Sequence, residues 1–268
     1  MVAAAMAFVG CASAEAMTAQ GPTASEVAAP APSLGLYPGE TMAFEVHLAG
    51  ILAGEAQVAV GEVGDVNGVQ AIVVTSRVAT AGAVALIKAI SDEATTVVDV
   101  ATGRPLSLAA TLSANGKAST AAATFAPDGR SASVTYRRPQ DTEDKTTVVK
   151  FGSREVYDAH TAMAAMRGWR AQTGTPRTVW VIGGRRLWRI DMTYVGEETI
   201  GSALGNRRAI VLEGKGYRAR GNMTVDEAKP GRTFRVWLSD DGDRVPLKVT
   251  ATTELGDVVM DLTEYQRP

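Results

Sequence analysis

Histidine and cysteine carry much of enzymatic and metal chemistry, and this sequence has only two histidines and one cysteine. A Ser-His-Asp arrangement would have to use His47 or His160. His47 lies beside Glu45 on the polar side of an alternating segment, which indicates a surface residue. His160 follows Asp158 by two residues at the start of a predicted helix. The pair could serve a hydrolase of unfamiliar type, but the simpler interpretation is a partly buried histidine that seats the helix on a sheet.

A second group of candidate side chains is the acidic run of Asp240, Asp241 and Asp243 around Gly242. A calcium loop of the EF-hand type needs a carboxylate at its twelfth position, where this chain has Ala251. A turn in which aspartate side chains accept backbone amides explains the same residues more simply. We therefore predict a turn here, without a metal ion.

Asp99 and Asp240 occupy matching positions in two similar segments. Each lies six residues before a proline, Pro105 or Pro246, that opens an alternating strand. Proline fixes φ where the strand begins, and an aspartate acceptor stabilises the preceding turn. We predict structural roles in turns for all four residues. The repetition also favours duplicated β-units, although unrelated β-meanders of similar composition would look alike.

Sequence motifs for cofactor and nucleophile sites are absent. The chain has no Gly-x-x-x-x-Gly-Lys-Ser/Thr run and no strand-linked Gly-x-Gly-x-x-Gly for a phosphate group. It has no His-Glu-x-x-His and no Gly-x-Ser-x-Gly, and one cysteine cannot build a Cys-rich zinc site or an internal disulfide. We expect a protein without cofactor, metal or catalytic activity.

Net charge argues against a nucleic-acid partner, and hydropathy argues against a membrane-spanning helix. Lys and Arg total 27 against 29 Asp and Glu, so the formal net charge is -2. A nucleic-acid partner needs a concentrated basic face, and we expect none. No stretch reaches the roughly 18–20 uninterrupted apolar residues of a membrane-spanning helix.

The amino-terminal residues predict export. The apolar segment 1–11 ends in Val9, Gly10 and Cys11, which is typical of a bacterial lipoprotein signal in which the cysteine is lipidated. Residues 12–36 are rich in Ala, Pro and Ser and read as a disordered tether, followed by one β-rich domain over 37–268. We expect a periplasmic protein attached to the outer membrane through a lipid anchor. Ala12-Ser13-Ala14 leaves open an ordinary cleavage site and a soluble periplasmic or secreted protein, and a plain buried apolar segment is the third interpretation.

The rest of the chain reads as strands and turns. Thr41–Leu48 alternates apolar and polar residues, and many similar segments follow, separated by Gly-rich or Asp-Gly and Asn-Gly turns. This pattern predicts an all-β, mainly antiparallel domain with a curved or barrel-like sheet. One helix is expected over Ala159–Trp169 with Asp158 as its N-cap, and Ala81–Ile90 is expected to form a short amphipathic helix or a packed apolar lid.

Three motifs resemble a known family. They are Tyr37-Pro38-Gly39-Glu40 followed by Gly50-x-x-x-Gly54-Glu55-Ala56, then Tyr157-Asp158-Ala159-His160-Thr161-Ala162 with Arg167, and Val236-Trp237-Leu238-Ser239-Asp240 with Pro246-Leu247-Lys248. In order and spacing they resemble the bacterial envelope family DUF3108, from Tyr37 to Tyr265. The resemblance implies an exported location and a β-fold. It implies no reaction, because the function of the family is unknown.

The apolar surplus suggests a binding function. The four tryptophans (Trp169, Trp180, Trp188 and Trp237), together with Met163 and Met166, could line a cavity in a curved sheet or simply form a packed core. We expect a non-catalytic module for an apolar ligand, such as a lipid, for an envelope component or for a protein partner. A structural or assembly factor without ligand, and the hydrolase above, are the alternatives. The residues expected to contact a ligand or partner are Tyr157, Asp158, His160, Arg167, Trp237, Leu86 and Ile87.

Overall fold

The computed structural model describes residues 34–253 and 256–268, and these form one 15-stranded sheet with two helices. The strands are β1 (Thr41–Leu48), β2 (Ile51–Val66), β3 (Val69–Thr80), β4 (Ile90–Asp99), β5 (Pro105–Ala114), β6 (Lys117–Phe125), β7 (Ser131–Arg137), β8 (Lys145–Lys150), β9 (Val156–Tyr157), β10 (Pro176–Gly183), β11 (Arg186–Ser202), β12 (Gly205–Ala219), β13 (Arg232–Ser239), β14 (Pro246–Thr253) and β15 (Gly256–Gln266). The helices are α2 (Gly82–Ile87) and α3 (Ala159–Gly168). The predicted all-β, mainly antiparallel class is confirmed.

The sheet is two meanders joined at the middle. Its order runs from β8 to β1 and then from β15 to β9, so that the first and last strands of the domain are neighbours. Every pairing is antiparallel except that of β9 with β10. The sheet is strongly curved, but it is not closed, because the outer strands β8 and β9 do not pair with each other.

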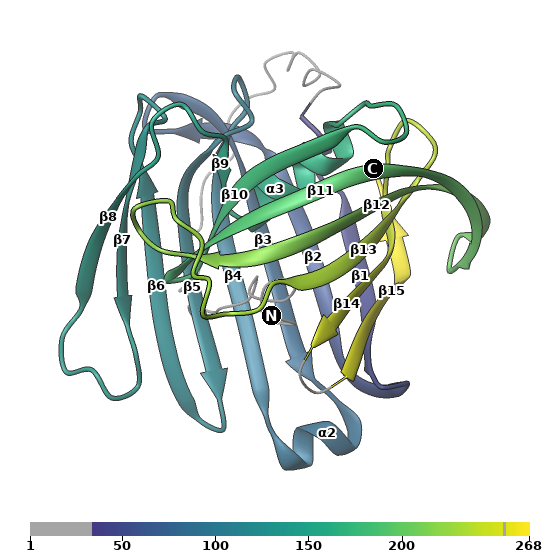
Figure 1. The fold of residues 1–268 in the computed structure, drawn as a ribbon, viewed down its shortest axis with the longest axis horizontal. Helices are drawn as coiled ribbons and strands as arrows, with labels where there is room; N and C mark the ends of the chain where they lie inside the picture. The colour runs from purple at the N-terminus through teal and green to yellow at the C-terminus, as the bar shows by residue number, and fades with distance from the viewer. Residues whose placement is uncertain (1–33, 254–255) are drawn as a thin grey trace.

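The curvature brings the two ends of the sheet face to face. In Figure 1 the strands β3–β8 form the rear wall and β10–β15 cross in front of them, with α3 between the two. One core cluster joins Phe125 and Val134 of the rear wall to Trp180 and Ile182 of the front wall. The register shifts where β15 pairs with β1, where β2 pairs with β1 and β3, and where β11 pairs with β12; such bulges or irregularities bend strands and increase their twist.

The helix α3 begins where the sequence predicted. Asp158 is the N-cap: its carboxylate accepts the amide of Thr161, and the Thr161 hydroxyl accepts the amide of Asp158 in return. This reciprocal capping box satisfies amides that a helix start leaves without partners. At the other end Arg244 Nη1 donates to the carbonyl of Trp169 at 2.5 Å.

The chain packs against α3 before the predicted start of the domain. Gly35 has a φ of +65°, and a Cβ placed there would lie 2.1 Å from the carbonyl oxygen of Ala164 in the helix. Leu36 is buried in a cluster with Ala164 and Val98. The residues from Leu34 onward therefore belong to the domain, although their composition had placed them in the tether.

The segment predicted as a lid forms a helix that covers nothing. The six residues of α2 include no buried side chain, and Leu86 and Ile87 are 90% and 83% exposed. Neither residue reaches the interior, because α2 lies at the tip of the β3–β4 connection (Figure 1). No helix in residues 34–253 and 256–268 is long and apolar enough to cross a membrane.

Of the two predicted aspartate turns, the first is present and the second needs correction. Asp99 accepts the amide of Ala101 at 2.9 Å and the hydroxyl of Thr102 at 2.6 Å, and Pro105 opens β5 as predicted. Asp240 instead pairs with the exposed Arg208, at 3.0 Å from its Nε.

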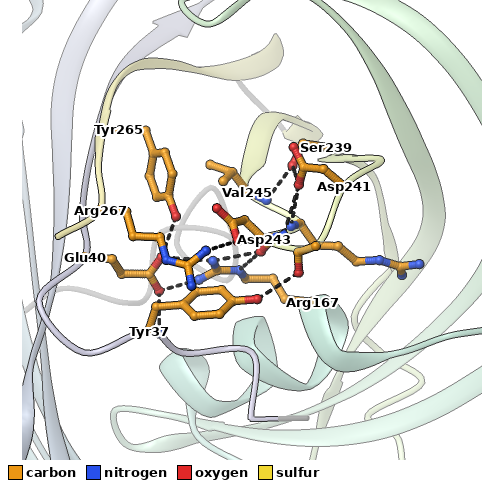
Figure 2. Close-up of polar contacts among 11 residues, drawn as sticks. Tyr37, Glu40, Arg167, Ser239, Asp241, Asp243, Val245, Tyr265 and Arg267 are labelled. Carbon is orange, nitrogen blue, oxygen red and sulfur yellow. Dashed lines mark hydrogen bonds and ion pairs between the residues drawn. The ribbon is translucent and has the colours of Figure 1, made fainter. Parts of the chain in front are cut away.

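The acceptor in the second turn is Asp241, the next residue along the chain. Its Oδ1 accepts the amides of Asp243 and Arg244 at 3.1 and 3.0 Å and the hydroxyl of Ser239 at 2.7 Å (Figure 2). The spacing to Pro246 pointed to the wrong aspartate because spacing along the chain does not determine which side chain faces into a turn.

We predict that Asp241→Ala lowers the stability by about 1–2 kcal/mol, because three donors lose their acceptor. Asp240→Ala is the matched control and changes it by less than about 0.5 kcal/mol, because its partner Arg208 is mostly exposed. Thermal or urea unfolding of both variants measures the difference. Equal losses would contradict the assignment of the turn to Asp241.

Candidate functional site

A largely apolar cavity of about 190 Å³ lies between α3 and the inner face of the sheet. The helix supplies Ala162, Met163 and Met166 to its wall. The strands β1–β3 on one side and β10–β15 on the other supply the rest, which includes Phe44, Val58, Val78, Val181, Trp188, Ile190, Phe234, Val249 and Met260. Among the lining residues only Gln57, Ser76 and His160 have polar side chains.

A chain of buried hydrogen bonds forms the polar edge of this cavity. The hydroxyl of Thr96 donates to the carboxylate of Asp158, and Thr96 Oγ1 lies 2.7 Å from His160 Nδ1. Because the hydroxyl proton of Thr96 is directed to Asp158, its oxygen accepts from Nδ1–H of His160. Nε2 of His160 is then an acceptor and receives the hydroxyl proton of Ser76 at 2.8 Å. The order of the contacts thus assigns one tautomer to the imidazole.

Burial favours the neutral form of His160. Its side chain is 3% exposed, and removal from water lowers its pKa below the usual range, while the charge of Asp158 opposes the shift. The backbone amide of His160 donates to Asp158 Oδ2 at 3.3 Å, whereas the imidazole Nδ1 lies 3.7 Å from that oxygen and contacts the carboxylate through Thr96. A neutral imidazole whose Nε2 accepts the hydroxyl proton of Ser76 has the geometry of a general base beside a hydroxyl nucleophile.

The carboxyl-terminal end of α3 is fixed by a buried ion pair. Arg167 Nη1 and Nη2 donate to Glu40 Oε1 and Oε2 at 2.6 and 2.9 Å, and both side chains have no exposed surface (Figure 2). Arg167 also donates to the carbonyl of Asp243 from Nη2 and Nε, at 2.9 and 3.2 Å. This fork-to-fork geometry is the strongest arrangement of a guanidinium and a carboxylate.

Two tyrosines complete the surroundings of the ion pair. Tyr37 donates its amide to Glu40 Oε1, donates its hydroxyl to the carbonyl of Gly242, and lies under the guanidinium of Arg167 with 5.1 Å between charge and ring centre. The hydroxyl of Tyr265 donates to Glu40 Oε2 at 3.3 Å, and burial raises the pKa of this phenol. The ion pair therefore connects the start of the domain, α3, the β13–β14 turn and the last strand.

A further buried carboxyl lies outside this network. Asp92 is 7% exposed on β4, and its Oδ1 has no hydrogen-bond partner. Desolvation raises the pKa of Asp92 to about 7. It is not among the cavity-lining residues, and in the described part of the chain no group of three or more His, Cys, Asp or Glu side chains could bind a metal ion.

The structure brings only part of the predicted contact set together. His160 lines the cavity, and Asp158 orients it through Thr96. Tyr157 accepts from Arg177 outside the cavity, and Arg167 is committed to Glu40. Cys11 lies outside the described residues.

Trp237, Leu86 and Ile87 also fall outside the cavity. Trp237 donates to Glu198 on the opposite face of β13 from Val236 and Leu238, which do line the cavity. Of the other aromatic and methionine candidates, Met163, Met166 and Trp188 line it, whereas Trp169 and Trp180 do not.

Sequence reasoning missed Ser76, Thr96 and Glu40. Ser76 occupies an inward position of β3, whose other inward residues are apolar, and Thr96 lies between Ala94 and Val98 on the inward face of β4, which also carries Asp92. A polar residue in the inward register of an otherwise apolar strand was the available signal. Glu40 belongs to the first of the three family motifs, but no pattern along the chain linked it to Arg167.

Comparison with known proteins now adds a family. The model of DUF3108, a family of proteins of unknown function, matches residues 43–263. The chain belongs to the DUF3108 family. The matched region contains α3 and the β13–β14 motif, and Tyr37–Glu40 lies just before it. No curated protein matches this DUF3108 chain.

Solved structures support the fold. A β-barrel-like protein from Brucella abortus, of the domain of unknown function DUF1849, is 9% identical at a TM-score of 0.55, over 85% of this chain and 96% of that one. A protein with a YmcC-like fold from Bacteroides fragilis (7% identity, TM-score 0.41, 86% and 98%) and the hypothetical lipoprotein YmcC from Escherichia coli (9%, 0.30, 88% and 88%) are more distant. Because the last two scores fall below 0.5, the first alone supports the barrel-like architecture.

We predict that Glu40→Gln destabilises the protein by about 3–5 kcal/mol, because it leaves the guanidinium of Arg167 buried without a countercharge. Asp144→Asn is the control: it breaks the exposed Arg137–Asp144 pair, whose side chains are about half exposed, and costs less than about 1 kcal/mol. Urea unfolding measures both. A loss below about 1 kcal/mol for Glu40→Gln would show that the ion pair does not support the fold.

Proposed function

We propose that this protein is a non-catalytic binding protein of the bacterial envelope whose cavity holds an apolar ligand, such as part of a lipid acyl chain. The observation that carries the proposal is the cavity between α3 and the sheet, with almost only aliphatic, aromatic and methionine side chains in its wall. Its volume of about 190 Å³ is larger than the ~150 Å³ apolar cavity that stays dry in another protein and binds benzene.

The attachment of α3 supports a persistent cavity. A core normally closes around empty space until packing is dense. Here the helix cannot move inward freely, because Asp158 and His160 are bound to the rear wall at one end and Arg167 to Glu40 and Asp243 at the other. The space between these two attachments thus remains available for a ligand.

The location in the envelope rests on the sequence and on the family. The lipoprotein-type segment before Cys11 supports export, lipidation of that cysteine and attachment to the outer membrane. A lipoprotein carries more than one acyl chain, which stable anchoring requires. An anchored domain lies next to a supply of apolar ligands.

A second candidate function is hydrolysis of an acyl ester by Ser76, with His160 as general base. The 2.8 Å contact and the relay through Thr96 to Asp158 favour it. Ser76 lies in the middle of β3, however, with Val58 and Ala94 paired on either side, so that the backbone amides near it serve the sheet. No pair of free amides is thereby offered to an oxyanion, and binding is the better supported function.

We predict that Ala162→Leu weakens binding of the apolar fluorophore N-phenyl-1-naphthylamine by about tenfold or more, because the added side chain occupies the cavity. Ala162 lines the cavity, and leucine suits a helix almost as well as alanine, so the melting temperature should not fall. Ala122→Leu, at an exposed position of β6, is the control. Wild-type affinity in Ala162→Leu would exclude the cavity as the binding site.

We also predict that a fluorophosphonate probe for activated serines leaves the protein unlabelled. The reason is that the hydroxyl of Ser76 has a base but no oxyanion donors. Intact-mass measurement after incubation detects the adduct, with Ser76→Ala and His160→Ala as comparison variants. Labelling that both variants abolish would replace the binding function by the hydrolase.

A further inference from the structure

Four large apolar side chains gather in solvent at one end of the molecule. Leu86 and Ile87 of α2 are 90% and 83% exposed, and Ile51 and Leu52 at the start of β2 are 62% and 37% exposed. The two segments touch: the amide of Ala81 donates to the carbonyl of Ala53 at 2.9 Å, and α2 packs on β2. We call Ile51, Leu52, Leu86 and Ile87 the apolar tip.

The apolar tip projects from the body of the domain. In Figure 1 α2 extends beyond the ends of the neighbouring strands, as the lowest element of the view. The helix has six residues, no side-chain cap and no buried residue. A helix this short gains little stability from its own hydrogen bonds. Single exposed apolar residues are ordinary, whereas a cluster of them at a tip marks an interaction site.

Charges around the apolar tip are sparse, and two lysines lie next to its helix. The segments 49–54 and 82–87 contain no ionisable side chain, and Lys88 directly follows Ile87. Lys117 lies in the next hairpin, whose Asn115 accepts the amide of Ala89 at 3.0 Å. On the side of the domain body, Glu55 is exposed on β2, three residues after Leu52, and the carbonyl of Asp257 accepts the amide of Ala49.

The apolar tip continues from the wall of the cavity. Val78 on β3 and Ala56 on β2 line the cavity and pair with each other. At about 3.3 Å per residue, the chain leads from Val78 to the start of α2 within roughly 13 Å. The same two strands therefore connect the cavity with the exposed apolar cluster.

We propose that the apolar tip inserts into the headgroup region of a lipid bilayer with anionic lipids, and so places the cavity beside a source of acyl chains. A stable protein interface takes roughly 20–30 residues on each side, whereas this convex cluster offers four side chains. A bilayer needs no complementary shape, accepts aliphatic side chains to a depth of about 5–10 Å, and attracts flanking lysines. The apolar tip shares no residue with the lining of the cavity.

The single cysteine of the sequence makes insertion measurable in the full chain. In a Cys11→Ser background, Ile87→Cys carries an environment-sensitive fluorophore at the apolar tip, and Val148→Cys carries it at an apolar residue of β8 that is 56% exposed. On addition of phosphatidylethanolamine–phosphatidylglycerol vesicles we expect a blue shift for position 87 and none for position 148. The affinity for vesicles of phosphatidylcholine alone, which lack anionic lipid, should be about fivefold lower for each lysine that comes close to the membrane surface.

Partition between vesicles and solution gives the matched mutational test. Leu86→Asp/Ile87→Asp should weaken vesicle binding by about 100-fold, and Val148→Asp should leave it unchanged. Both variants should keep the melting temperature and N-phenyl-1-naphthylamine binding of the wild type, which separates the apolar tip from the cavity. The proposal would be overturned by no blue shift at position 87 or by equal shifts at both positions. A blue shift at position 87 that appears without vesicles when the protein concentration is raised would also overturn it, in favour of contact with a second copy of the chain.

Discussion

The Glu40–Arg167 ion pair is the contact on which the arrangement of the site depends. Both charges are removed from water, which costs several kcal/mol for each, and the cost is offset only where the partner geometry is complete. The offset is favourable here, because the carboxylate and guanidinium meet in two hydrogen bonds and the Asp243 carbonyl accepts from Nη2 and Nε of the same guanidinium. The pair joins four segments that are far apart along the chain and meet where β1 pairs with β15.

This attachment explains why α3 can border a cavity. The Ser76–His160–Thr96–Asp158 chain fixes the beginning of the helix, and Arg167 fixes its end. Between the two lie Ala162, Met163 and Met166, whose side chains are small or flexible. A helix bound by polar contacts at both ends leaves the apolar space between it and the sheet unfilled, and this space is the feature of the DUF3108 chain that suits a ligand.

Local patterns were sufficient to predict the all-β class, β1 and the start of the helix. The alternation of apolar and polar residues predicted β1, and the residue type and position of Asp158 predicted the N-cap of α3. The pairing of β1 with β15 was not predictable, because it joins residues more than 200 positions apart and no local pattern encodes such a contact. For the same reason Glu40 could not be assigned to Arg167, although both stood in motifs that resembled the family.

Side-chain direction limited the prediction of the site. Trp237 was expected at the ligand from its size, but β13 directs Val236 and Leu238 inward instead. Leu86 and Ile87 were expected to cover the interior, and they face water. The sequence marks all three residues as apolar, and only the placement of the elements decides which surface they belong to.

Native mass spectrometry of the protein extracted gently from its own envelope tests the central claim most directly, namely that the cavity below α3 holds an apolar ligand. The account predicts a population that carries a noncovalent lipid-like molecule in addition to any covalent modification, and that releases it when collisional activation is raised. A single species at the mass of the chain and its covalent modifications, under conditions that preserve known lipid complexes of similar affinity, would contradict it.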